Sequence, residues 1–197
     1  MNTCLETRAY APFAAGERWY NRWLMQLLVR TRLENPMIVD VESMSEDQYE
    51  AYREECDSRS SAEYRMRREI CGIEIAEIAE ALGVRVDTAK RWENPNKGMP
   101  PSLRAWAYVD SAYFSLLDAV EAAVQQAEDA EEACGDRVPV RIAYRRGNQP
   151  ARDGMTVGMS NAVARASIVA LTVLGYDASA EWVDDGVASL AASVDVR

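Results

Sequence analysis

Hydrophobic residues between Gly72 and Glu93 recur with the 3.6-residue period of two short helices that meet at a sharp turn. The first helix has a hydrophobic face at i, i+3, i+4 and i+7, formed by Ile75, Ile78, Ala79 and Leu82. Gly83 follows, and a glycine at this place can take the left-handed conformation that closes a helix. Val84 is then placed to cover the core below the turn.

The second helix of this pair is predicted from Val86 to about Glu93, with Ala89 and Trp92 facing inward. The residues that point away from the first helix are then Arg85, Val86, Asp87, Lys90 and Arg91. Three of these five are cations, and a helix with such a face can enter the major groove of DNA, where Arg and Lys bind guanine edges or phosphates. A helical hairpin that only packs inside an all-α protein is the alternative.

The N-terminal part, residues 1–58, is predicted to be helical. One helix begins at Glu17 and ends near Pro36, and its Trp and Leu stripe is interpreted as core. Binding of this helix to a membrane, to nucleic acid or to a partner protein is the alternative. An acidic helix capped by Ser43 or Ser45 is predicted next, and Ser45 with Gln48 matches the pattern of a capping box.

The polar stretch at residues 57–61 predicts a break and a domain boundary, after which a helix from Ser61 leads into the helix pair. A long helix follows the pair. It is capped by Ser102, runs to about Cys134 and has hydrophobic residues at heptad-like steps. Its first half is expected to pack on the helix pair, whereas its alanine-rich acidic second half is either a coiled coil or a solvated arm.

The C-terminal part combines a strand with a helix. Residues 138–145 alternate in polarity, which predicts a strand. A helix capped by Ser160 and ended by Gly175 is predicted next.

The amino-acid composition excludes several kinds of catalytic and metal-binding chemistry. The chain has 197 residues, of which 48% are hydrophobic and 27% charged, as in an ordinary globular protein. It has no histidine, which excludes Ser-His, Cys-His and His-metal chemistry. Its four cysteines are far apart in the sequence, and no glycine-rich phosphate-binding loop is present. We therefore expect a protein that is not an enzyme, with no catalytic residues, no metal ligands and no cofactor.

The net charge of −10 is unevenly placed along the chain. Residues 40–57 hold eight acidic residues and one arginine, and residues 105–136 hold eight acidic residues and no basic one. Residues 58–104 hold nine basic and seven acidic residues, so the helix pair lies in a mildly cationic segment of an acidic protein. Binding to DNA therefore stays plausible.

The N-terminal residues have neither a basic head with a clean apolar run nor a small-residue cleavage site, and no run of about 18 apolar residues occurs. We expect a cytoplasmic protein that does not enter a membrane.

The string LGVxxxTxxRWE at residues 82–93 resembles the Cro/repressor-like (XRE-type) helix-turn-helix family, and the similarity covers about Arg65 to Arg104. The resemblance implies a DNA-binding fold whose motif core is Ile78, Ala79, Gly83, Val84 and Trp92. It also implies that bases are read by Arg85, Val86, Asp87, Lys90 and Arg91.

The family usually begins its first helix with a Ser or Thr cap and a phosphate-binding Gln, whereas Glu74 and Ile75 stand at these places here. A carboxylate repels a phosphate. We therefore expect the phosphate contacts to come from other residues, namely Arg65, Arg67, Arg68 and Lys97.

The order of elements over residues 61–185 is also similar to that of anti-CRISPR-associated phage-type regulators, which carry an appended α+β dimerisation region. This resemblance implies a homodimer held through Val138–Tyr144 and Ser160–Tyr176. It implies an operator-binding repressor of phage or mobile-element type, whose two recognition helices bind an inverted repeat in double-stranded DNA.

The predicted fold is therefore mainly α. A helical N-terminal extension (1–58) precedes a helix-turn-helix domain with its long helix (59–134) and a small α+β region for dimerisation (135–197). A different class of function stays open, because the acidic segments suit a protein-interaction module or inhibitor, antitoxin-like or DNA-mimicking, built on a helix-turn-helix scaffold. Residues 1–58 are the expected site for a protein partner.

Overall fold

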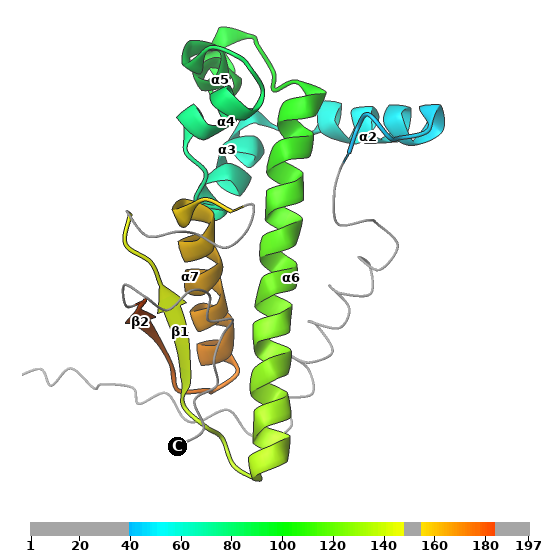
Figure 1. Cartoon of the computed structure of the whole chain (residues 1–197). Helices are drawn as coiled ribbons and strands as arrows, with labels where there is room; N and C mark the ends of the chain where they lie inside the picture. Colours follow the sequence, from blue (N-terminus) through cyan, green and yellow to red (C-terminus); the bar gives the residue numbers. More distant parts are fainter. Residues whose placement is uncertain (1–39, 148–154, 184–197) are drawn as a thin grey trace, which may run out of the picture. The chain divides into compact units, whose positions relative to one another are not determined.

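The computed structural model describes residues 40–147 and 155–183, all of which belong to one compact unit that begins at Met37. This part of the chain is mainly helical, as the sequence predicts, and it also contains a small parallel sheet (Figure 1). Its elements are α2 (Glu46–Ser58), α3 (Ser61–Ile70), α4 (Ile75–Ala81), α5 (Val86–Trp92), the 3₁₀-helix η1 (Pro95–Lys97), α6 (Leu103–Cys134), β1 (Val140–Tyr144), α7 (Val157–Val173) and β2 (Ala178–Trp182).

Three predicted helix starts are confirmed by side-chain caps. The Ser45 hydroxyl accepts from the Gln48 amide at 3.3 Å, and the Gln48 side chain accepts from the Ser45 amide at 3.0 Å, which completes the capping box of α2. Ser60 caps α3, and Ser102 caps α6 with a bond of 3.2 Å from the Ala105 amide. Local polar chemistry thus sets these boundaries.

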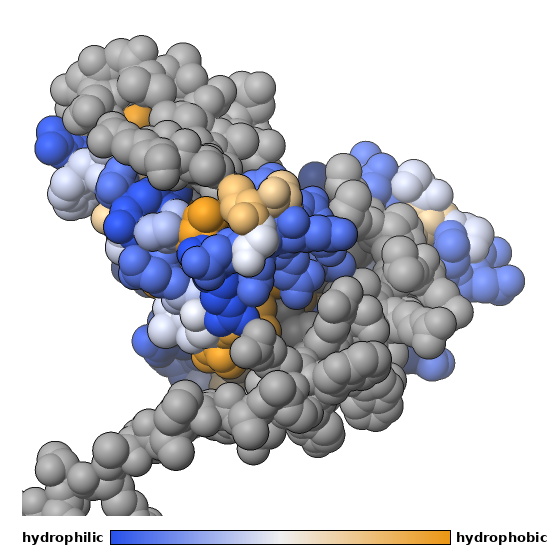
Figure 2. Space-filling model, turned by 90° about the horizontal axis from the view of Figure 1, so that it is seen from below, coloured by the Kyte–Doolittle hydropathy of each residue, from blue (hydrophilic) through white to orange (hydrophobic). Residues whose placement is uncertain are grey.

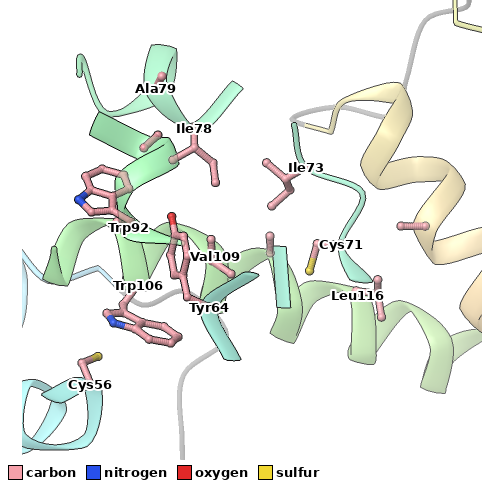
Figure 3. Packing of buried hydrophobic residues seen from close by; sticks show 14 of the residues in the cluster. Cys56, Tyr64, Cys71, Ile73, Ile78, Ala79, Trp92, Trp106, Val109 and Leu116 are labelled. Atoms are coloured by element: carbon pink, nitrogen blue, oxygen red, sulfur yellow. The ribbon is translucent and has the colours of Figure 1, made fainter. Parts of the chain in front are cut away.

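The main hydrophobic core lies between α3, α4, α5 and the first half of α6 (Figure 3). Tyr64 is 1% exposed and stands between two indoles, with ring centroids 5.1 Å from Trp106 and 6.3 Å from Trp92. Both contacts have edge-to-face geometry, which aromatic pairs favour. The predicted packing of the first half of α6 on the helix pair is therefore confirmed.

Asp110 of α6 is fully buried and joins three segments of the chain. Its Oδ2 atom accepts from the Tyr52 hydroxyl at 2.9 Å and from Arg59 Nη1 at 2.7 Å, and its Oδ1 atom accepts from Arg67 Nη1 at 2.6 Å. Burial, together with the charge of Asp110, raises the pKa of Tyr52, so its hydroxyl stays a donor. These bonds tie α2, the α2–α3 connection and α3 to α6.

Hydrogen bonds and an ion pair link the two sides of the predicted domain boundary at residues 57–61. The polar stretch does end one helix and begin the next, but α2 belongs to the same compact unit as α3 to α7. Arg59 lies in the middle of that stretch, and its contact with Asp110 holds the connection against α6. The helix predicted from Glu17 to Pro36, and most of the N-terminal extension, lie outside the described residues.

The second half of α6 is neither of the two predicted structures, because α7 packs along it. A second hydrophobic cluster forms there between α6, α7 and the sheet, and its buried members are Ala127, Val140, Ile142, Ala164, Leu171 and Tyr176. Alanines on α6 permit this close approach, whereas a coiled coil would need larger side chains at those positions. Glu121, Asp129 and Glu132 are exposed, whereas Glu131 accepts from the Tyr176 hydroxyl at 2.8 Å.

The C-terminal region forms a strand–helix–strand unit. β1 confirms the predicted strand, and it pairs in parallel with β2 so that Val140 lies opposite Ala178 and Tyr144 opposite Trp182. β2 was not predicted, because its five residues include no β-branched side chain and three of them are exposed. The predicted Ser160 cap of α7 is wrong, since the helix begins one turn earlier at a Thr156 cap.

Two glycines bring α7 against the turn between α3 and α4. A Cβ atom added at Gly158 would lie 2.2 Å from the Gly72 carbonyl oxygen, and one added at Gly72 would lie 2.4 Å from the Gly158 carbonyl oxygen. Gly72 also has a positive φ of 67°. Backbone therefore meets backbone here, which fixes the C-terminal unit on the α3–α4 turn.

Replacing Gly158 by alanine is expected to lower the free energy of unfolding by about 1–3 kcal/mol, because the new methyl group must push α7 away from Gly72. The effect is measured by urea denaturation. The matched control is Gly147→Ala, since a Cβ atom at Gly147 meets nothing within 4 Å. Equal stabilities of the two variants would contradict this close packing.

Hydrophilic residues cover most of the described surface seen in Figure 2, and hydrophobic residues form small groups between them. Among the described residues, no helix combines the length and the apolar character needed to cross a bilayer.

Candidate nucleic-acid interface

The outer face of α5 carries the five residues predicted to read bases, and the structure brings all of them to the surface. The Arg85 side chain is 86% exposed and the Asp87 side chain is 70% exposed. The two form an ion pair in which Arg85 Nη2 lies 3.8 Å from Asp87 Oδ2. Val86 is 41% exposed, and Lys90 and Arg91 are exposed as well. This face is therefore available to a large partner such as a DNA groove.

The inner face of α5 is locked into the core. Ala89 and Trp92 are each 3% exposed, as predicted, and Trp92 packs against Tyr64 (Figure 3). The turn before α5 also has the predicted form, because Gly83 has a φ of 64° and the Val84 amide donates to the Ala79 carbonyl at 2.9 Å. These contacts fix the direction in which the outer face points.

A buried ion pair holds the C-terminal end of α5. Glu93 caps this end, and its carboxylate pairs with Arg68 of α3, with both side chains less than 10% exposed. Arg68 Nη1 also donates to the Ile73 carbonyl at 2.7 Å. Arg68 is thus a positioning residue for α5, a role that sequence reasoning missed because the two residues are 25 positions apart.

The four residues predicted to bind phosphate fall into two groups. Arg67 bonds to Asp110 and to Glu63, and Arg68 is 8% exposed in its pair with Glu93, so both are used inside the protein. Carboxylates of the protein therefore already match the positive charges of both residues, and phosphate binding by these two stays a prediction.

Arg65 and Lys97 remain on the surface. The Arg65 side chain is 59% exposed and bonds to Glu69 at 2.8 Å, and Lys97 is exposed in η1, which follows α5. An exposed ion pair of this kind contributes little to stability, so Arg65 can exchange Glu69 for a phosphate.

The start of α4 presents acidic groups. The Glu74 amide donates to the Glu77 carboxylate at 2.7 Å, so the first turn of this helix is closed by carboxylates. A phosphate at this helix start would meet negative charge. Phosphate contacts must therefore come from elsewhere on the surface.

Two cysteines, Cys56 and Cys71, are buried in the main hydrophobic core. Burial raises the pKa of Cys56 to about 11 and that of Cys71 to about 12, and Cys134 is exposed. Since the thiolate is the reactive form, we expect a thiol reagent at pH 8 to modify Cys134 quickly, and Cys56 and Cys71 only on unfolding. Labelling of a Cys4→Ser variant, followed by mass spectrometry, tests this. Three fast-reacting thiols would contradict the described packing.

Within the described ranges, no group of three or more His, Cys, Asp or Glu side chains is placed to hold a metal ion. Comparisons with protein-family models, with curated proteins and with solved structures gave no match. The geometry of α5 and its surroundings therefore carries the functional argument.

Proposed function

We propose that this protein is a sequence-specific DNA-binding transcriptional regulator, a repressor of phage or mobile-element type that binds its operator through α5. The single observation that carries the proposal is the two-sided character of α5, whose outer face is exposed and cationic while Ala89 and Trp92 lie in the core. A helix held this rigidly can enter the major groove without losing much conformational freedom.

Each exposed side chain of α5 has a chemical role in this proposal. Arg85, Lys90 and Arg91 donate to guanine O6 and N7 or to phosphates, Asp87 accepts from a cytosine amino group, and Val86 contacts a thymine methyl group. A good bidentate contact contributes roughly 1–3 kcal/mol of discrimination against the wrong base. Arg65 and Lys97 add contacts to the backbone.

A homodimer would place two copies of α5 in successive major grooves, about 34 Å apart, and block transcription by occupying the operator. The C-terminal unit supports such a dimer with an exposed apolar strip on α7. Val169 is 63% exposed and Val173 is 68% exposed, one helical turn apart.

The experiment that tests the proposal is a gel shift of the purified protein on the DNA upstream of its own gene, at several salt concentrations. We expect a discrete complex whose affinity falls steeply with salt, because bound cations release counterions from the phosphates. No complex at low salt would contradict the proposal.

A protein-interaction module or inhibitor is the second candidate, and the surface of α2 favours it. This helix exposes its acidic residues and turns only Tyr52 and Cys56 toward the core. Such a face can imitate the charge of nucleic acid toward a basic partner. Co-purification of a basic protein with the wild type, lost when Glu46, Glu50 and Glu54 are changed to glutamine, would support this function.

A further inference from the structure

The three most exposed large hydrophobic side chains of the described residues all lie in the strand–helix–strand unit. Val173 is 68% exposed, Val169 is 63% exposed and Trp182 is 57% exposed. Met66 of α3 comes next, at 49%. Exposed hydrophobic residues that form one continuous surface mark a site of interaction, whereas single ones do not. Such a site requires that the three side chains share one surface.

A chain of contacts joins these side chains. Arg165 stands one turn before Val169 on α7, and its Nη1 atom donates to the Tyr144 hydroxyl at 3.1 Å. The Tyr144 ring meets the Trp182 ring edge-on, with the ring centroids 5.5 Å apart. The open side of α7 therefore continues onto the ends of β1 and β2.

Part of the sheet is left uncovered by the helices. Ile142 lies opposite Ala180 and Tyr144 opposite Trp182, so the members of each pair point to the same side of the sheet. Ile142 is buried in the second hydrophobic cluster, but Ala180 and Trp182 are exposed. This side of β2 thus extends beyond the cover that α6 and α7 provide. We name as the α7–β2 face the surface formed by Arg165, Val169, Val173, Ala180 and Trp182.

Hydrophobic residues lie on three sides of α7. Ala170 packs against the main core, and Leu171 is buried in the second cluster. Val169 and Val173 lie on the remaining, open side, and Arg165 is the one charged residue of the whole helix. A helix that is hydrophobic all round is ordinarily buried, so the open side is the part of α7 that lacks a partner.

The pattern along this open side suits a second copy of the same helix. Ala166, Val169 and Val173 follow one another at steps of three and four residues, the spacing at which two helices pack along a common seam. A two-fold contact uses the same surface on both subunits, and a seam of valines can pack against itself. Ala180 and Trp182 enlarge this contact toward the roughly 600 Å² per subunit at which stable interfaces begin.

The charge of the α7–β2 face also permits self-association. Residues 154–176 contain no acidic residue, although the chain has a net charge of −10. In β2, Glu181 points to the other side of the sheet, where its carboxylate lies 3.4 Å from Arg141 Nε. Two copies can therefore meet at this face without bringing carboxylates together, which the acidic surface of α2 would not allow.

We propose that a second copy of this chain covers the α7–β2 face, and that the two α7 helices pack side by side in the same direction. Since α7 begins against the α3–α4 turn, where Gly158 meets Gly72, parallel pairing puts both α4–α5 pairs at one end of the dimer (Figure 1). Two recognition helices must lie at the same end to enter one duplex, so the direction of pairing rests on the proposed DNA-binding function.

Cysteine cross-linking tests the contact and its direction. In a chain that carries Cys4→Ser and Cys134→Ser, Val169→Cys should give a disulfide-linked dimer with diamide, because parallel pairing brings the two copies of residue 169 within about 7 Å. Met66→Cys, at an exposed hydrophobic position of α3, is the matched control and should stay monomeric. If Val169→Cys links to Val173→Cys in a mixture but not to itself, the helices are antiparallel and the proposal is overturned.

Sedimentation velocity without DNA tests the self-association itself. The wild type should sediment as a dimer, and the double variant Val169→Glu, Val173→Glu as a monomer at the same concentration, because its carboxylates would be buried at the contact. Both side chains are exposed in a single copy, so the circular dichroism spectrum should not change. Met66→Glu should remain a dimer. A monomeric wild type, or a dimer that survives both valine substitutions, would overturn the inference.

The two proposals can fail separately, because neither measurement uses DNA. If the protein dimerises and cross-links as expected but gives no complex in the gel shift, the α7 contact stands and the proposed function fails. If the protein binds its operator but does not dimerise through α7, the proposed function stands and this inference is overturned.

Discussion

Replacement of Asp110 by alanine is expected to lower the free energy of unfolding by about 3–5 kcal/mol, which is the usual cost of removing one partner from a buried ion pair. Asp110 is 0% exposed and accepts from Tyr52, Arg59 and Arg67. The Arg59 and Arg67 side chains are only 9% and 16% exposed, so the alanine variant removes their one fully buried counterion and leaves them only the more exposed carboxylates of Glu55 and Glu63.

Urea denaturation followed by circular dichroism measures this effect. Asp129→Ala is the matched control, because Asp129 lies on the exposed side of the same helix, and it should change the stability by less than about 0.5 kcal/mol. Asp110→Asn keeps a group that can accept from the Tyr52 hydroxyl but removes the negative charge. Its free energy of unfolding should therefore lie between those of Asp110→Ala and Asp129→Ala. If Asp110→Ala is as stable as Asp129→Ala, the buried network does not hold α2 and α3 to α6.

Replacement of Arg91 by alanine is expected to lower the preference for operator DNA strongly while leaving the fold intact. Arg91 lies in the last turn of α5 on its exposed face, so its loss removes a base contact and no core packing. A bidentate contact of roughly 1–3 kcal/mol corresponds to about a 5- to 150-fold fall in the ratio of operator to scrambled-site affinity. Fluorescence anisotropy with both duplexes measures this ratio.

The Arg91→Ala measurement needs two comparisons. Its unfolding midpoint should match the wild type, which shows that α5 is still folded. Arg53→Ala removes the same charge from α2 and should leave the affinity ratio unchanged. If the variant folds normally and keeps the operator preference, Arg91 does not contact the bases.

Local patterns in the sequence were enough to predict the helices around the core. The period of Ile75 to Leu82 with Gly83 after it predicted α4 and its turn, and Ser45 and Ser102 predicted two helix starts. These features depend on neighbours within one or two turns of a helix. The same local logic predicted which residues of α5 face outward.

Long-range pairings could not be predicted in this way. The Asp110 network joins residues 43 to 58 positions apart, and a charged residue on a helix pattern is ordinarily expected to face solvent. Arg67 and Arg68 were therefore interpreted as phosphate ligands, although their carboxylate partners hold them inside. β2 was missed for the same reason, since a short strand of mostly exposed residues is defined by its partner.

Selection of binding sites from a pool of random duplexes tests the central claim, that α5 reads DNA sequence, most directly. The account predicts that the wild type enriches an inverted repeat with half-sites about 10 base pairs apart, and that Arg91→Ala enriches this repeat far less. If the wild-type protein enriches no sequence over the starting pool, α5 is not a reading helix, and the acidic face of α2 becomes the surface to examine for a protein partner.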